Sequence, residues 1–211
     1  MRTFVIALVA LALLCTLAAS VVADETFEVV ADSTINGNDG FLLRITEPGE
    51  GGTTLFLFEE VGKIRAYAER EFGSAVWDIF SGAQYVCPAT SMSLNDSWRA
   101  LDDEGEETVA NVVAQESITT GAGTFTCFKV DIARASNPNT ITENLWFSSG
   151  TGLVRQYDTF PDDWQSDLQN VIITGGSGFF PLAVGNTWDY SEISTPLETS
   201  SWGAVKVDFG D

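Results

Sequence analysis

Thr108 to Ala133 reads TVANVVAQESITTGAGTFTCFKVDIA, two runs of β-branched and aromatic residues on either side of a Gly-Ala-Gly sequence. β-Branched and aromatic residues favour strands, and glycine allows the backbone of a tight turn. We therefore expect two long antiparallel strands, Thr108–Ile118 and Thr124–Ala133, joined at Gly121–Gly123. Apolar residues occur in both phases of the second strand, which requires a bulge or the burial of both faces.

The chain after residue 24 repeats this pattern of short apolar segments and turn residues. A second hairpin is expected from Thr140–Ser148 and Leu153–Asp158, which flank Gly150-Thr151-Gly152. Lys63–Glu71 has helix-forming residues but also alternates with a period of two, and we favour a strand. The other expected strands are Thr26–Val30, Phe41–Glu47, Thr53–Glu60, Ala75–Phe80, Gln84–Cys87, Ser97–Asp102, Val171–Thr174, Thr187–Ser191 and Trp202–Phe209.

One segment has the features of a short helix. Pro161–Asn170 begins with proline, continues with two acids and places Trp164 and Leu168 four residues apart. We expect this helix to pack the two apolar side chains across one mouth or face of the sheet. The sequence thus predicts an all-β fold: an antiparallel, strongly curved sheet or incomplete barrel of roughly ten strands with one short helix.

The N-terminus has the pattern of a Sec-type signal peptide. Arg2 precedes the apolar run FVIALVALALL, and Val21-Val22-Ala23 supplies the small residues that a signal peptidase reads before Asp24. An uncleaved membrane anchor is the alternative, because the segment after Arg2 is uncharged and long. We expect cleavage of residues 1–23, leaving residues 24–211 as a single antiparallel β domain with no membrane span that is secreted, periplasmic or at the cell surface.

Acidic residues dominate the charge. The chain has 30 Asp and Glu against 10 Lys and Arg, and only Arg2 lies in the expected signal peptide, so the mature net charge is −21. Such a field repels nucleic acid and anionic lipid, and it favours cations and basic partners. We therefore expect no nucleic-acid partner.

Two cysteines, Cys87 and Cys127, remain after signal cleavage. An even pair in an oxidising compartment predicts a disulfide, which would tie the strand near Gln84 to the strand near Phe125. Such a bridge would contribute roughly 4 kcal/mol to stability in the chain-entropy account. Two buried free thiols are the alternative.

The chain has no histidine, which excludes Ser-His-Asp and Cys-His catalysis and histidine metal sites. It also has no phosphate-binding loop or dinucleotide fingerprint, so we expect no cofactor. Carboxylate pairs remain for catalysis, although outward-facing strand acids are the simpler interpretation and we assign no catalytic residue. The least arbitrary carboxylates are Glu116, Glu143 and Asp158.

An acidic turn is a weak candidate for calcium, because hard cations bind clustered oxygen ligands. Its residues do not have EF-hand spacing, and a solvated acidic turn is the simpler interpretation. The candidates are Asp102, Asp103, Glu104 and Glu106.

Several tryptophans fall in the expected strands. They would line the concavity of an open curved sheet, where aromatic walls suit an apolar ligand. Packing in a filled core is the alternative. These candidates for a ligand pocket are Trp77, Trp98, Trp146 and Trp188.

Two turns resemble each other in sequence. Leu94–Trp98 (LNDSW) is similar to Val184–Trp188 (VGNTW), and the two tryptophans stand 90 positions apart. Either half of the sheet is duplicated or the same turn signal recurs. By inspection, the segments between the two turns do not match.

Four segments occur in a set order: LNDSW (94–98), QESITTGAGTF (115–125), CFKV (127–130) and LWFSSGTGLV (145–154). In this order they resemble uncharacterised bacterial periplasmic or lipoprotein domains, which are themselves similar to the periplasmic lipoprotein-carrier fold. The resemblance extends over Leu94–Tyr157. It implies an incomplete antiparallel barrel with an apolar concavity.

Three classes of function are compatible with these features. We expect an exported, non-enzymatic binding module that holds an apolar small molecule or an extracytoplasmic protein partner in the sheet concavity. A structural or adhesive cell-surface domain is the first alternative, and a carboxylate-based hydrolase is the second. Whether the concavity is open or filled bears directly on the choice.

Overall fold

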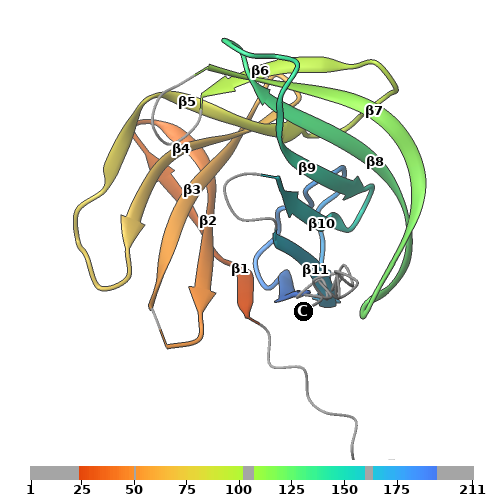
Figure 1. Cartoon of the computed structure of the whole chain (residues 1–211). Coiled ribbons are helices and arrows are strands. Elements are labelled where there is room, and N and C mark those ends of the chain that lie inside the picture. The colour runs from red at the N-terminus through yellow and green to blue at the C-terminus, as the bar shows by residue number, and fades with distance from the viewer. Residues whose placement is uncertain (1–23, 50, 102–106, 160–163, 194–211) are drawn as a thin grey trace, which may run out of the picture.

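The computed structural model describes residues 24–49, 51–101, 107–159 and 164–193. Twelve antiparallel strands form one sheet in these residues (Figure 1), in the order β5-β4-β3-β2-β1-β12-β11-β10-β9-β8-β7-β6. The strands are β1 Glu25–Ile35, β2 Asn38–Glu47, β3 Gly51–Glu60, β4 Lys63–Glu71, β5 Asp78–Pro88, β6 Ser97–Leu101, β7 Glu107–Thr120, β8 Gly123–Arg134, β9 Ile141–Ser148, β10 Gly152–Asp158, β11 Trp164–Ile172 and β12 Thr187–Glu192. The predicted signal peptide, the acidic turn at 102–106 and the strand expected at 202–209 lie outside the described residues.

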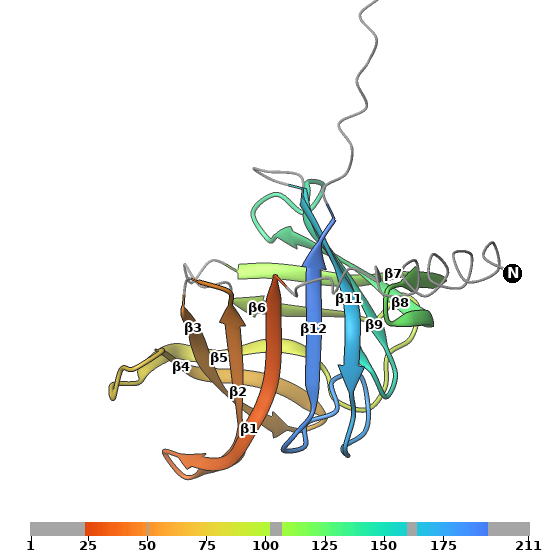
Figure 2. The same ribbon diagram turned by 90° about the horizontal axis from the view of Figure 1, so that it is seen from below.

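The sheet curls until its edge strands, β5 and β6, touch, but their described residues form no ladder. All the remaining pairs of consecutive strands are hydrogen-bonded. β12 also pairs with β1, as the view from below shows (Figure 2). The expected all-β, antiparallel, strongly curved sheet is therefore confirmed, with twelve strands and a gap between β5 and β6.

Both predicted hairpins are confirmed. β7 and β8 pair from Thr108 opposite Arg134 to Thr120 opposite Gly123, with a bulge after Val112. β9 and β10 pair across the turn at Gly150, so β7, β8, β9 and β10 are sequential neighbours. The ambiguous segment Lys63–Glu71 is strand β4, whereas the two short strands expected before Pro88 are the single strand β5.

The predicted helix over Pro161–Asn170 is wrong, because Trp164–Ile172 is strand β11, paired with β10 and with β12. A spacing of four residues places Trp164 and Leu168 on one face of a helix, but it does the same in a strand, where alternate residues share a face. Pairing with two neighbours outweighs the local helix signal. The described residues contain no helix that could span a membrane.

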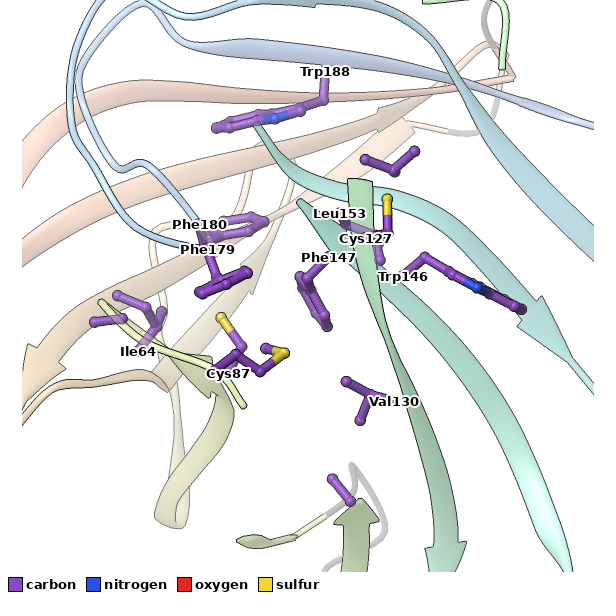
Figure 3. Packing of buried hydrophobic residues seen from close by; sticks show 14 of the residues in the cluster. Ile64, Cys87, Cys127, Val130, Trp146, Phe147, Leu153, Phe179, Phe180 and Trp188 are labelled. Atoms are coloured by element: carbon purple, nitrogen blue, oxygen red, sulfur yellow. The ribbon is translucent and has the colours of Figure 1, made fainter. Parts of the chain in front are cut away.

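The predicted Cys87–Cys127 disulfide is also wrong, because both cysteines are free thiols. Cys87 lies on β5 opposite Ile64, and Cys127 lies on β8 opposite Glu116. Two strands, β7 and β6, stand between β8 and the gap that borders β5, and Figure 3 shows the two side chains on separate strands. Burial raises the pKa of both thiols, that of Cys127 to about 12.

We expect the mature protein to carry two unreactive thiols. The thiolate is the nucleophile, so burial and a raised pKa should make native alkylation by iodoacetamide slow. In denaturant both cysteines should react. Intact-mass measurement without reductant tests this expectation. A native mass lower by two hydrogens, restored by a reductant, would show a disulfide instead.

The interior is filled at one end by the loop between β11 and β12, residues 173–186, which we call the interior loop. Phe179 and Phe180 are each 5% exposed. Phe180 stacks on Trp188 (Figure 3) with ring centroids 5.2 Å apart. Phe179 meets Phe128 edge-on, with ring centroids 5.7 Å apart. The backbone N–H of Phe179 donates to the carbonyl of Ala89 at 3.1 Å, so the loop also joins the segment that links β5 to β6.

Asn186 fastens the interior loop from inside the protein, where it is completely buried. Its Oδ1 accepts hydrogen bonds from the backbone N–H and the hydroxyl of Thr174, at 2.7 and 2.9 Å, and from the N–H of Gly175 at 3.3 Å. Its Nδ2 donates to the carbonyls of Gly175, at 3.0 Å, and Pro181, at 2.6 Å. One side chain thus satisfies polar groups at both ends of the loop.

The two similar turns make the same hydrogen bonds. The N–H of Asn95 donates to Val112, whose own N–H donates to Asp96. The N–H of Gly185 likewise donates to Val29, whose N–H donates to Asn186. A bulge follows both valines, so the two turns occupy equivalent places in two halves of the sheet, β6–β11 and β12–β5.

Candidate functional site

Acidic side chains lie on the inner face of the sheet where β1 begins and β2 ends. Glu25 lies opposite Tyr190, and both share a face with the buried Val29. Alternation along β2 places Glu47 on the same inner face as Leu43, which is opposite Val29. The next strands extend the row of acids, because Glu71 lies opposite Thr53 on that face.

The second half of the sheet contributes acids at the same end. Glu143 on β9 lies directly opposite Asp158 on β10. Glu143 lies opposite Ile132 of β8, and Phe147 of the same strand lies opposite Phe128. Glu143 and Phe147 are four residues apart in a strand, so they share a face. Because Phe128 contacts the interior loop, these acids are on the inner face as well.

We call these inward-facing carboxylates the acidic rim. They occupy the end of the sheet opposite the interior loop, which leaves from the other ends of β11 and β12. Arg134, at the end of β8, adds a positive charge to the same face. The acidic rim consists of Glu25, Glu47, Glu69, Glu71, Asp78, Glu143 and Asp158.

Burial, with a smaller effect of neighbouring like charges, raises the pKa of two of these carboxyl groups. Burial, and then the neighbouring Glu47, raise the pKa of Glu25 to about 7. Burial, and then Asp158, raise the pKa of Glu143 to about 7. Gln156 donates a hydrogen bond of 2.7 Å to Glu143. The rim therefore holds negative charge at an energetic cost, which a bound cation would reduce.

A pocket of about 400 Å³ opens beside the rim. Its lining includes two acidic residues, and glycines leave part of the wall without side chains. Phe72 is 61% exposed, and its ring lies 5.7 Å from the guanidinium of Arg44. The lining residues are Glu47, Gly51, Gly52, Thr53, Glu71 and Phe72.

The four candidate tryptophans lie in different environments. Trp188 is completely buried against Phe180, and Trp98, on edge strand β6, is 9% exposed. Trp146 donates its indole N–H to Glu116 at 2.5 Å. Trp77 precedes β5 and lies 4.7 Å below the guanidinium of Arg70.

Trp146 belongs to a polar network on a face that also carries Cys127. Arg155 pairs with the buried Asp167 through two bonds of 2.5 and 2.6 Å, and its guanidinium lies 5.9 Å from the Trp146 ring. Lys129 lies 5.4 Å from the same ring. The ring of Trp146 therefore lies near two cations as well as in the hydrophobic core.

Of the three candidate catalytic carboxylates, the structure brings Glu143 and Asp158 together and places Glu116 elsewhere, bonded to Trp146. The described residues contain no group of three or more acids or cysteines arranged to hold a metal ion. The calcium candidates at 102–106 lie outside the described residues.

Five rim residues were not predicted from the sequence: Glu25, Glu47, Glu69, Glu71 and Asp78. A signal was present, because acids stand two positions from inward-facing apolar residues at strand ends, as Glu25 does from the partly buried Phe27. Recognising one rim also required the strand order, which the alternation of residues does not give.

Comparison with known protein families matches residues 88–160 to the DUF3108-like family, a family of uncharacterised domains. No curated protein and no solved structure matches the chain. The match includes strands β6 to β10. It ends two residues after the rim residue Asp158, which is the last residue of β10. Over residues 88–160, the chain is therefore similar to the DUF3108-like family.

Proposed function

We propose that the protein is an exported, non-enzymatic binding module that holds a basic segment of a protein partner at the acidic rim. The observation that carries the proposal is the strand register, which directs carboxylates of six strands inward at one end. The signal-peptide pattern of residues 1–23 supports export to the periplasm, the cell surface or the medium.

A protein partner suits this site better than an apolar small molecule. Phe179 and Phe180 of the interior loop occupy the aromatic interior, and Trp188 beside them is completely buried. The whole chain has a net charge of −20, which attracts cations toward the protein and its acidic rim. Complementary charge also accelerates the encounter with a basic partner.

Binding of a capped octalysine peptide tests the proposal. We expect saturable binding by calorimetry at low salt, and about tenfold weaker binding after Glu143→Gln with Asp158→Asn, because two nearby attractions are lost. The control pair, Asp32→Asn with Glu59→Gln, removes the same charge from exposed positions outside the rim. It should weaken binding less than twofold.

Equal losses in the two variants would show that overall charge, and not the rim, binds the peptide. Absence of binding by the unmodified protein would contradict the proposal directly. Titration with a long-chain fatty acid should leave tryptophan fluorescence unchanged, because Phe179 and Phe180 of the interior loop pack in the core beside Trp188. A saturable change in fluorescence would favour an apolar ligand instead.

A further inference from the structure

The outer face of β2 to β4 carries a row of residues with a charge opposite to that of the acidic rim. Arg44 follows the inward-facing Leu43, so its side chain lies on the outer face. Arg44 lies opposite Thr54 of β3, and Thr54 lies opposite Arg70 of β4. Because residues directly opposite each other share a face, two arginines flank the buried Thr54, and we call these three residues the arginine row.

Each arginine of the row lies against an aromatic ring. The guanidinium carbon of Arg44 is 5.7 Å from the centre of the Phe72 ring, and that of Arg70 is 4.7 Å from the centre of the Trp77 ring. A guanidinium that lies over a ring keeps N–H groups at its edge, which can donate two parallel hydrogen bonds to one carboxylate. The rings therefore restrain both guanidiniums and leave their hydrogen-bonding edges available.

Acidic side chains of the protein itself compensate these charges only weakly. Arg44 is 3.7 Å from Glu28, but both side chains are well exposed, where an ion pair contributes little to stability. Arg70 forms no ion pair with any residue that the structure describes. The chain has 30 acids for 10 bases, so an acidic neighbour for every arginine would be the ordinary arrangement.

The fold does not require arginine at these positions. Leu43 and Val130 each lie opposite the valine that precedes the bulge in their half of the sheet. The next residue is Arg44 in one half and Asp131 in the other, where Asp131 accepts a hydrogen bond of 2.9 Å from Asn144. The charge is therefore reversed between two halves that share their turns and bulges.

We infer that the arginine row binds an acidic segment of a protein partner, with one carboxylate at Arg44 and another at Arg70. Apolar side chains from the end of β4 to the start of β5 add contact surface, since Phe72 is 61%, Val76 68% and Ile79 45% exposed. Arginine and aromatic residues are also enriched in protein–protein interfaces. The inference does not rest on the acidic rim, which lies on the inner face.

Binding of a capped octaglutamate peptide to the mature chain, measured by fluorescence anisotropy at about 0.15 M salt, tests the inference. At this ionic strength, repulsion by the net charge of −20 is screened beyond about 8 Å. We expect saturable binding, weakened about tenfold by Arg44→Gln with Arg70→Gln. The control pair, Lys63→Gln at the other end of β4 with Arg99→Gln on β6, should weaken it less than twofold.

A second variant keeps the net charge. Arg44→Lys with Arg70→Lys removes the planar guanidiniums, and it should bind octaglutamate roughly three- to fivefold more weakly than the unmodified protein. Equal binding would show that charge alone attracts the peptide, which would contradict the inference. Circular dichroism of each variant confirms that the sheet is intact.

Octalysine separates this inference from the proposed function, because neither arginine variant should weaken its binding at the rim. If octaglutamate does not bind, or if the glutamine pair and its control lose equally, only this inference fails. Tighter binding of oligogalacturonate than of octaglutamate would make the ligand an acidic glycan and overturn the inference. Dimers of the unmodified protein that the glutamine pair abolishes would also overturn it, in favour of a second copy of the chain.

Discussion

Replacing Asn186 with leucine should lower the free energy of unfolding by about 3 to 4 kcal/mol, because it leaves several buried polar groups without partners. Asn186 is completely buried and bonds to Thr174, Gly175 and Pro181, so its loss releases both ends of the interior loop. The loop carries Phe179 and Phe180, which fill the core. Urea denaturation monitored by tryptophan fluorescence measures the change.

The similar turn provides a matched control. Asp96 occupies the position equivalent to Asn186, but it is exposed, and its carboxylate accepts one bond, from the N–H of Ser93 at 2.7 Å. Asp96→Leu should therefore cost about 1 kcal/mol, typical of a turn or cap residue. Equal losses at the two positions would mean that Asn186 acts only through its turn and not through the buried loop.

The parts of the fold that could be predicted are those governed by neighbouring residues. The turns at Gly121–Gly123 and Gly150–Gly152 connect strands that lie side by side, because short links permit few other arrangements. The helix expected before Asn170 failed because Trp164 and Leu168 share a face in a strand as well. The sequence of a segment does not show which strands will pair with it, so the pairing of β11 with β10 and β12 could not be predicted.

The disulfide and the interior loop show the same limit. Cys87 and Cys127 are buried in separate parts of the core, and compartment and cysteine count alone could not separate a bridge from two thiols. The apolar sequence Phe179–Leu182 lies in a loop that enters the interior, where its side chains pack in the core. No periodicity marks such a loop in the sequence.

The two halves of the sheet also resemble each other in sequence, beyond the two similar turns. Val29–Ile35 (VVADSTI) is similar to Val112–Ile118 (VVAQESI), and Gly62–Tyr67 (GKIRAY) is similar to Gly152–Tyr157 (GLVRQY). The first pair has the bulge after its leading valine in both halves. One half of the sheet consists of β6 to β11, which are continuous in sequence. The other half consists of β1 to β5 together with β12, so its first strand in the sheet comes from the far end of the sequence.

The two halves differ where function is proposed. The family match over residues 88–160 falls within the half formed by β6 to β11, whereas the pocket at Glu47, Glu71 and Phe72 belongs to the other half. Residues shared by the halves maintain the turns and bulges of the fold. The pocket beside the acidic rim therefore lies outside the matched residues.

Stability should fall as the pH rises from about 4.5 to about 8, and Glu143→Gln should remove a large part of that fall. Burial and Asp158 raise the pKa of Glu143 from 4.5 to about 7, and burial and Glu47 do the same for Glu25. Folding therefore favours the protonated acids. Their contribution to stability is complete below the unfolded pKa and is lost as the pH rises through the folded pKa.

At pH 8 the Glu143→Gln variant should be more stable than the unmodified protein by on the order of 1 to 2 kcal/mol, less than the full shift implies because Glu143 is partly exposed to solvent. At pH 4.5 the two proteins should have nearly equal stability, since glutamine resembles the protonated acid. Urea denaturation at pH 4.5, 6 and 8 measures both. Glu59→Gln, at an exposed position on β3, controls for the change in net charge. If the pH dependence of Glu143→Gln equals that of the unmodified protein, the Glu143–Asp158 pair does not carry the charge crowding that we assign to the acidic rim.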